Sequence, residues 1–188
     1  MSLNCYHCVT TPLMPIQLDD TLPALGCSDC RGVYLDLLTY RHWLERQPKA
    51  GQNLLDETLA SDSEINIDEI DNTENALVCQ RCRKFMLKYR INNEHENTIN
   101  VCHTCDDVWL DSGEWALLKH LNMQDKLTEV MSEPWQQHLR SEAKEQSFKA
   151  HYQRLLGEDF ARVEDFATWL AVHPKKSEIR HYLSQLHQ

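Results

Sequence analysis

The stretch CHTCDDVWLDSGEW, residues 102–115, decides the fold of this chain, because a similar stretch, CSDCRGVYLDLL, occurs nearer the N-terminus at residues 27–38. In both stretches a Cys-x-x-Cys pair precedes valine, an aromatic residue, leucine and aspartate in the same register. Another Cys-x-x-Cys pair lies upstream of each, eighteen residues before Cys27 and nineteen residues before Cys102. The eight cysteines of the 188 residues therefore form one four-cysteine unit that occurs twice.

This spacing is typical of a zinc site with four cysteine ligands. A pair with two intervening residues lets both thiolates lie about 2.3 Å from one ion, and two pairs complete a tetrahedron. We therefore predict two Zn²⁺ ions per chain, with Cys5, Cys8, Cys27, Cys30, Cys79, Cys82, Cys102 and Cys105 as metal ligands. Because four thiolates leave no position open for water, the predicted sites are structural rather than catalytic.

Disulfides and redox chemistry are the alternatives to metal binding. Disulfides need an oxidising compartment, but the first residues lack the basic start and apolar run of a signal peptide. The sequence also contains no apolar stretch of eighteen residues that would span a membrane. We expect a cytoplasmic protein, where thiols bind metals or catalyse. A thioredoxin-like dithiol would lie in an alternating β/α pattern, and no such pattern surrounds any of the pairs.

Two details of the ligand sets are open from the spacing alone. His7 and His103 lie inside the first and last Cys-x-x-Cys pairs and could replace a cysteine, although four cysteines suffice. The pairs could also interleave, as in the cross-brace of RING-type domains. Repetition of the whole unit, including the residues that follow it, favours one closed site per unit.

The residues around the second unit resemble the transcription-factor zinc-finger family, which is named for its likeness to the zinc ribbon of transcription factor IIB. The family pattern is Cys-Pro-x-Cys, a spacer, and Cys-x-x-Cys-x-Gly-x-Trp-Leu-Asp-x-Gly-Glu-Leu. The second unit matches it at Cys102, Cys105, Trp109, Leu110, Asp111, Gly113 and Glu114. The first unit matches it at Cys27, Cys30, Gly32, Leu35 and Asp36.

The two units depart from the family pattern at a few positions. The first has Tyr34 in place of the tryptophan and Leu38-Thr39 in place of Gly-Glu. Neither unit has proline after its first cysteine, where Tyr6 and Gln80 stand. The resemblance implies two zinc ribbons, each with a small antiparallel sheet, and implies little about activity.

The sequence thus predicts a small α+β protein, with two four-cysteine zinc ribbons followed by a C-terminal helical bundle. The predicted boundaries are 1–47 for ribbon 1 with a short helix, 48–76 for an acidic linker, 77–115 for ribbon 2 and 112–188 for the helical region. Short strands are expected at the Val-aromatic-Leu segments. Asp36 and Asp111 are expected to be helix N-caps rather than catalytic carboxylates.

Four helical segments are expected after Ser112. The first runs over 112–131, and the second runs from Pro134 to Leu156, with Gly157 as its C-cap. The third and fourth follow the apolar periodicity around Trp169 and Tyr182 and are separated by His173-Pro174. We expect the core of this bundle to consist of Phe148, Tyr152, Phe160, Phe166, Trp169 and Tyr182. Metal removal is then expected to unfold the ribbons and leave the bundle folded.

Charge bears on the function. The formal net charge is −10, and residues 51–76 of the predicted linker have eight carboxylates and no lysine or arginine. It is either a solvated linker or an acidic arm for a basic partner. The one basic cluster comprises Arg81, Arg83, Lys84, Lys88 and Arg90. An acidic chain disfavours nucleic acid as a partner, because cations that neutralise phosphates contribute much of that affinity.

The sequence is compatible to different degrees with three classes of function. We expect a non-enzymatic, zinc-binding adaptor that contacts another protein through its ribbons and helical tail. The alternative is a nucleic-acid-binding or transcription-associated factor that uses the second ribbon, where Arg81 and Lys84 would face solvent. An enzyme is the third class, but the sequence offers no nucleophile, no open metal site and no glycine-rich loop among its five glycines.

Overall fold

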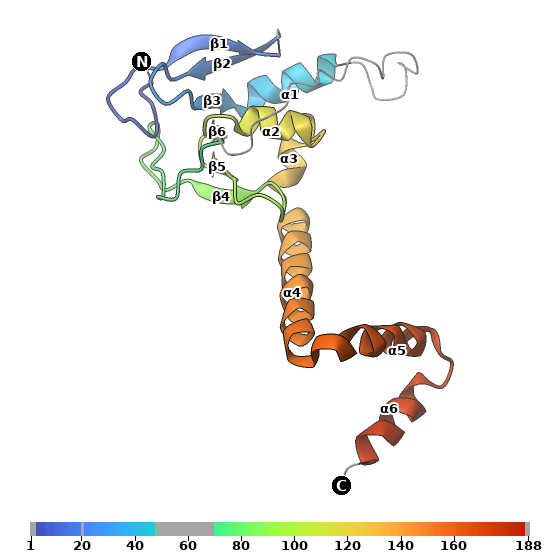
Figure 1. Cartoon of the computed structure of the whole chain (residues 1–188). Helices are drawn as coiled ribbons and strands as arrows, with labels where there is room; N and C mark the ends of the chain where they lie inside the picture. Colours follow the sequence, from blue (N-terminus) through green and yellow to red (C-terminus); the bar gives the residue numbers. More distant parts are fainter. Residues whose placement is uncertain (1–2, 20, 48–69, 187–188) are drawn as a thin grey trace. The chain divides into compact units, whose positions relative to one another are not determined.

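The computed structural model describes residues 3–19, 21–47 and 70–186, and it is an α+β protein (Figure 1). The strands are β1 (Met14–Leu18), β2 (Leu22–Gly26), β3 (Val33–Asp36), β4 (Leu87–Arg90), β5 (Thr98–Cys102) and β6 (Asp107–Leu110). The helices are α1 (Leu37–Arg46), α2 (Glu114–His120), α3 (Leu127–Val130), α4 (Glu133–Leu156), the short 3-10 turn η2 (Gly157–Asp159), α5 (Phe160–Val172) and α6 (Lys176–Gln185).

The described strands form one antiparallel sheet in the order β1-β2-β3-β6-β5-β4. Each four-cysteine unit therefore contributes three strands, and the two sets meet at β3 and β6. In the β3–β6 register Tyr34 lies opposite Trp109, which is its own counterpart in the repeat. Val33 lies opposite Leu110, and Leu35 lies opposite Val108. The two units are thus related by an approximate two-fold axis between Tyr34 and Trp109. We call residues 3–36 repeat 1 and residues 77–111 repeat 2.

The two faces of the sheet have different partners, because successive side chains of a strand point to opposite faces. One face packs against α1, α2 and α3, which lie along the sheet (Figure 1). Its buried strand residues are Leu22, Ala24, Val33, Leu35, Ile99, Val101, Val108 and Leu110. Helix residues such as Tyr40, Trp43, Trp115 and Leu118 complete this core. Since it draws on both repeats, the two repeats and three helices share one apolar core.

The opposite face of the sheet holds a second buried cluster, which contains the cysteines. Tyr34 and Trp109 lie at its centre, with Tyr6, Leu13, Leu77 and Met86 around them. The ring of Tyr6 stacks on that of Trp109, with 5.3 Å between centroids and 25° between planes. This cluster also joins the repeats, because Tyr6 comes from repeat 1 and Trp109 from repeat 2.

The strands and helices expected from the sequence are largely present. The Val-aromatic-Leu segments are β3 and β6, and Asp36 caps α1 by accepting a hydrogen bond from the Thr39 N–H at 2.8 Å. Helix α4 ends at Leu156, and Gly157 follows with φ 55°. This left-handed conformation is common just past a helix C-terminus.

The helix expected over 112–131 is interrupted. Helix α2 ends at His120, and α3 begins only at Leu127. Asn122 has φ 53°, and the Met123 N–H bonds back to the Leu118 carbonyl at 2.7 Å. Asparagine tolerates the left-handed conformation that closes a helix end. The prediction of one continuous helix over 112–131 is therefore wrong, although Asn122 is a residue type that can indicate a helix end in the sequence.

The chain divides into two compact units, residues 1–139 and 140–188. The expectation that the second unit packs its aromatic residues into a helical core is wrong. Phe148, Tyr152, Phe166, Trp169 and Tyr182 are exposed, and Phe160 is only half-buried. Of the apolar residues described in 140–186, Leu170 is the one that is buried. The region is helical, as expected, but its helices do not enclose a core of their own.

Trp135, in the first turn of α4, belongs to the first unit. Its indole N–H donates to the Ile91 carbonyl at 3.2 Å, and the ring packs against the helix-side core. Residues 48–69 of the predicted acidic linker lie outside the described residues, which include 70–76. The sequence-based domain boundaries stay predictions.

Candidate metal centres

The structure gathers the eight cysteines into two groups of four. One comprises Cys5, Cys8, Cys27 and Cys30, and the other comprises Cys79, Cys82, Cys102 and Cys105. Within each group all the sulfur atoms lie within 4.8 Å of one another. The groups follow the repeats, so the pairs do not interleave as a cross-brace would require.

The sulfur separations match a tetrahedral thiolate site. Four sulfurs at about 2.3 Å from one ion lie ~3.8 Å apart. In the first quartet the Sγ atoms of Cys5 and Cys30 are 3.5 Å apart, and those of Cys8 and Cys27 are 4.0 Å apart. In the second quartet Cys82 Sγ and Cys102 Sγ are 3.4 Å apart. All eight residues are free thiols. The donor set therefore fits a Zn²⁺ ion in each quartet.

Each Cys-x-x-Cys pair is followed by a residue in the left-handed conformation. These residues are Val9 (φ 66°), Arg31 (φ 59°), Arg83 (φ 62°) and Asp106 (φ 56°). In two of the pairs the N–H group that follows this residue bonds the second sulfur: the Gly32 N–H donates to Cys30 Sγ, and the Lys84 N–H donates to Cys82 Sγ. None of the four is glycine, the residue type that would have indicated such a turn from the sequence.

The pKa values of the thiols depend on their burial and their hydrogen bonds. Burial raises the pKa of Cys5 to about 11 and that of Cys79 to about 12. By contrast, a hydrogen bond from the Lys84 N–H lowers the pKa of Cys82 to about 7. A divalent cation is what would allow all four sulfurs of a quartet to ionise together. Metal binding then releases protons and weakens in acid.

His7 and His103 lie near the quartets but belong to neither. The Nε2 atom of His103 hydrogen-bonds the Tyr89 hydroxyl at 2.6 Å, and the two rings are 5.6 Å apart. The Nδ1 atom of His7 lies 4.0 Å from Cys8 Sγ. Both imidazoles are exposed.

Gly32 and Trp109 fit each other across the two-fold axis. A Cβ atom added to Gly32 would lie 2.2 Å from Cζ2 of Trp109, so the indole occupies the space above this glycine. The counterpart of Gly32 in repeat 2 is Asp107, and the counterpart of Trp109 is Tyr34. There the smaller phenol leaves room for a carboxylate, and the Tyr34 hydroxyl donates to Asp107 Oδ1 at 2.8 Å.

Asp107 is a fully buried carboxylate beside the second quartet. Arg81 Nη1 lies 2.9 Å from its Oδ1 atom, and the Tyr6 hydroxyl donates to Oδ2 at 3.4 Å. Cys79 Sγ also lies 3.4 Å from Oδ2. A buried charge needs such partners, since an unpaired one destabilises the fold strongly. The hydrogen bond to Asp107, with its charge, raises the pKa of Arg81 further above its usual value.

The expectation that Arg81 faces solvent is met only in part. The side chain is 47% exposed, yet its guanidinium pairs with the buried Asp107 and also donates to the Cys105 carbonyl. The alignment of Asp107 with Gly32 could have indicated this ion pair from the sequence. A carboxylate in place of a packed glycine needs a cation, and Arg81 lies in the adjacent Cys-x-x-Cys pair.

Other members of the basic cluster also have partners within the chain. Lys84 Nζ donates to the Thr104 hydroxyl at 3.3 Å, and Lys88 Nζ donates to the Thr73 carbonyl. Arg90 donates to the His95 carbonyl at 3.3 Å. Four members of the cluster, Arg81, Lys84, Lys88 and Arg90, therefore bond to groups of repeat 2 or of the adjoining residue Thr73.

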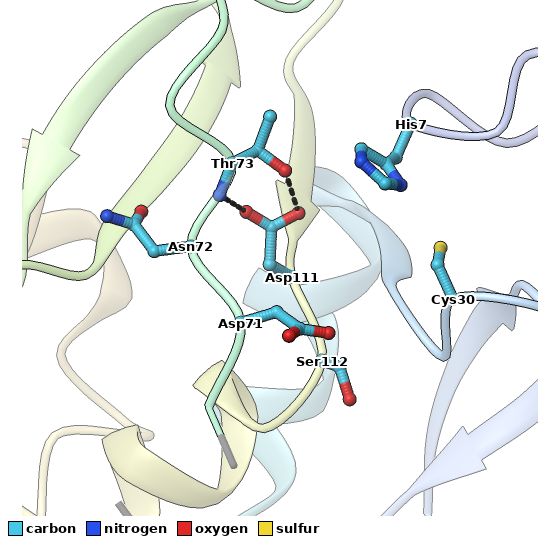
Figure 2. Close-up of a pocket in the computed structure, with 7 residues that line it drawn as sticks. All are labelled: His7, Cys30, Asp71, Asn72, Thr73, Asp111 and Ser112. Atoms are coloured by element: carbon cyan, nitrogen blue, oxygen red, sulfur yellow. Dashed lines mark hydrogen bonds between the residues drawn. The ribbon is translucent and has the colours of Figure 1, made fainter. Parts of the chain in front are cut away.

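Asp111 is not the side-chain N-cap that the sequence indicated. Its carboxylate accepts hydrogen bonds from the Thr73 N–H at 2.6 Å, the Thr73 hydroxyl at 2.9 Å and the Trp109 indole at 2.8 Å. Figure 2 shows Thr73 above the carboxylate, with both bonds dashed. Asp111 thus anchors the end of the acidic segment to repeat 2, and Gly113 occupies the N-cap position of α2.

The other half of the expected capping box is present. Glu114 Oε2 accepts a hydrogen bond from the Asp111 N–H at 2.9 Å, and the side chain is fully buried. Burial, with a smaller contribution from the charge of Asp111, raises the pKa of Glu114 to about 8.

A cavity of about 200 Å³ separates this anchor from the first quartet. It is lined by His7, Cys30, Asp71, Asn72, Thr73, Asp111 and Ser112 (Figure 2). His7 and Cys30 face it from repeat 1, and the other residues face it from the opposite side. Since the Asp111 carboxylate is already bonded to Thr73 and Trp109, the cavity offers no free pair of catalytic carboxylates there.

Comparisons of the chain with protein-family models, with curated proteins and with solved structures returned no match. Within the described ranges, no helix has the length and apolar character to cross a membrane.

Proposed function

We propose that each quartet holds one structural Zn²⁺ ion, that each repeat is a zinc ribbon, and that the chain is a non-enzymatic adaptor for another protein. The observation that carries the metal assignment is the closure of both quartets by free thiols with tetrahedral separations. Bound zinc would supply folding free energy, on the order of 10–16 kcal/mol in small zinc modules at neutral pH. It would leave no open coordination position for a substrate.

The adaptor assignment rests on the outer strand of repeat 2. Phe85 is 71% exposed and Leu87 is 54% exposed; Leu87 starts the edge strand β4, and Phe85 lies two residues before it. Edge strands have unpaired backbone groups that another chain can bind. Repeat 1 has Pro12 where repeat 2 has Phe85, since each forms the equivalent isolated bridge. The exposed aromatic residue is therefore a feature of repeat 2 alone among the two repeats.

The contacts of the basic cluster make nucleic acid the weaker candidate. Arg81 neutralises a buried carboxylate, Lys84 and Arg90 bond to groups of the same repeat, and Lys88 bonds to the Thr73 carbonyl. Phosphate binding would have to replace these contacts in a chain of net charge −10.

The metal assignment is tested by analysis of protein purified without added metal. We expect two zinc ions per chain and an X-ray absorption spectrum with sulfur ligands only. One zinc ion per chain, or a nitrogen ligand from His7 or His103, would contradict the assignment of all eight cysteines. Iron in place of zinc after overexpression would leave it intact, because four thiolates in a tetrahedron accept both metals.

The adaptor assignment is tested by co-purification from the native cell with the Phe85→Glu/Leu87→Glu variant. We expect the variant to keep its zinc and its fold and to lose the proteins that accompany the wild-type chain. Met14→Glu is the matched control, because Met14 is 57% exposed and starts the equivalent edge strand of repeat 1. Equal loss with both variants would contradict a specific surface on repeat 2.

A further inference from the structure

The helices of residues 140–186 expose most of their large apolar side chains. Eleven such residues are between 37% and 85% exposed: Phe148, Tyr152, Leu155, Leu156, Val163, Phe166, Trp169, Val172, Tyr182, Leu183 and Leu186. They recur at helical spacing, as with Phe148, Tyr152 and Leu155 on α4 and with Tyr182 and Leu186 on α6. We call this set the tail face.

Such a face is unstable in isolation. Helices α5 and α6 have 13 and 10 residues. Helices of this length are marginal in water unless an apolar face packs against something. The exposed rings of Phe148 and Tyr152 contact each other, as do those of Phe166 and Trp169, and exposed apolar side chains that gather in this way usually mark an interaction site. The tail face therefore requires an occupant.

The described surface of the first unit offers no apolar face of similar size. Its exposed large apolar residues are Val9, Met14, Leu38, Phe85 and Leu87. They are spread over a cysteine loop, two edge strands and α1, so they form no continuous counterpart. Among the surfaces of this chain, the tail face of a second copy is the one that matches the tail face in extent.

The charges along the tail favour pairing with itself. Residues 140–156 carry four basic and two acidic side chains. Residues 157–172 carry one basic and four acidic side chains, and residues 173–186 carry three basic and one acidic side chain. The formal charges of these segments are thus +2, −3 and +2. A two-fold arrangement with its axis between α4 and α5 would place the acidic α5 segment of each chain against the basic α4 segment of the other. The same attraction operates within one chain, where Lys149 Nζ lies 3.4 Å from a Glu164 oxygen.

The charge of the whole tail also permits self-association. Residues 140–188 have eight basic and seven acidic side chains, so their formal charge is +1. The remaining residues 1–139 then carry −11. Two acidic first units repel each other, whereas two nearly neutral tails do not.

We propose that the tail face is a homodimerisation surface, on which the tail helices of a second copy of this chain pack in an isologous, two-fold arrangement. The five exposed aromatic residues alone would remove roughly 500 Å² per chain from water, given about 150–250 Å² for each fully buried ring. The aliphatic residues bring the buried area towards the ~800 Å² per partner of a stable interface. The dimer does not depend on the metal proposal.

The first test is sedimentation of the full-length, zinc-loaded chain over a micromolar concentration series. We expect wild-type protein at twice the 22.1 kDa of one chain. The Phe166→Glu/Trp169→Glu variant should sediment as a monomer, because loss of two central aromatic contacts raises a dissociation constant by about a hundredfold or more. Met14→Glu, an exposed residue of the first unit, should leave the dimer unchanged.

A charge exchange provides a second test in case the aromatic variant fails to fold. Lys149→Glu/Arg154→Glu reverses the basic segment of α4, and Glu164→Lys/Asp165→Lys reverses the acidic segment of α5. We expect each variant alone to dimerise weakly and an equimolar mixture of the two to form a heterodimer that is tighter than either homodimer, although mixing does not restore the contact between Lys149 and Glu164 within each chain. Mixing can restore the contacts only if they lie between chains.

Three results would overturn the proposal. One is a monomeric wild-type chain throughout the series, which would also be the result if the tail packed on its own first unit or on a different protein. The second is a dimer that persists in Phe166→Glu/Trp169→Glu. The third is failure of the mixed charge variants to associate more tightly than either alone. Zinc content, measured in the same samples, separates these results from a failure of the metal assignment.

Discussion

Repeat 1 and repeat 2 have the same cysteine spacing and three strands each, yet they differ where they meet. On the two-fold axis repeat 1 presents Tyr34 and repeat 2 presents Trp109. Beside the axis repeat 1 has Gly32 and repeat 2 has the buried Asp107. The larger ring lies over the glycine, and the smaller ring bonds the carboxylate. A duplicated unit can thus pair with its own copy in one chain and then diverge by complementary substitutions across the axis.

The two repeats form one cooperative structure. The helix-side core takes residues from both repeats, and Tyr6 of repeat 1 stacks on Trp109 of repeat 2. The sequence-based expectation that metal removal would leave helical structure intact therefore needs revision. Helices α1, α2 and α3 depend on the sheet that the quartets hold together, and the tail helices depend on their own partner.

The largest expected effect comes from breaking the fit between Gly32 and Trp109. Gly32→Ala forces a methyl group into the indole, and we expect a loss of ~3 kcal/mol in the free energy of unfolding, at the upper end for overpacking. In a Trp109→Tyr background, where repeat 2 carries the ring of repeat 1, the same change should cost less. A double-mutant cycle by chemical denaturation of zinc-loaded protein should give a coupling energy of about 1–3 kcal/mol. Additive effects would contradict direct packing across the axis.

A smaller effect is expected at Arg81. Arg81→Ala leaves the buried Asp107 carboxylate without its cation, and we expect a loss of roughly 1–3 kcal/mol, reduced because Arg81 is half exposed. Arg83→Ala, two residues away, is the matched control and should have little effect on stability. Denaturation curves of both variants, together with the wild-type chain, provide the measurement. Equal stabilities would show that Tyr34 and Tyr6 alone satisfy Asp107.

The smallest effect concerns Glu114, a buried glutamate that follows repeat 2 at the position where Thr39 follows repeat 1. Its pKa is raised from 4.5 to about 8. Between these pH values the unfolded chain ionises this carboxyl group while the folded chain keeps it protonated, so the free energy of unfolding falls as the pH rises. Glu114→Gln removes this penalty. Relative to wild type, the variant should therefore gain stability from pH 6 to pH 8, by at most about 1.4 kcal/mol per pH unit. A difference that is constant with pH would contradict burial of a titrating carboxyl group.

Much of the local structure could be predicted from the sequence, because it depends on short-range patterns. The spacing of the cysteines gave the two quartets, and the Val-aromatic-Leu segments gave β3 and β6. The cap at Asp36 and the end of α4 at Gly157 follow from the preferences of single residues.

The contacts between distant segments could not be predicted in the same way. Tyr34 and Trp109 pair across a separation of 75 residues, and nothing in either strand alone specifies its partner. Asp111 satisfied the rule for an N-cap, but Thr73 from the distant acidic segment binds its carboxylate instead. The tail face shows the converse limit, since helical periodicity indicates which side chains gather on one face without showing what covers that face.

The central claim is that both quartets support one sheet, so loss of one should be felt in the other repeat. Hydrogen exchange of the Cys79→Ser/Cys82→Ser variant, loaded with zinc at neutral pH, tests it most directly. We predict that the amides of β3 in repeat 1, which pair with β6, lose protection together with those of repeat 2, although Cys5, Cys8, Cys27 and Cys30 are unchanged. Wild-type protection throughout β2 and β3, with one zinc ion retained, would contradict the claim and show that the repeats fold independently.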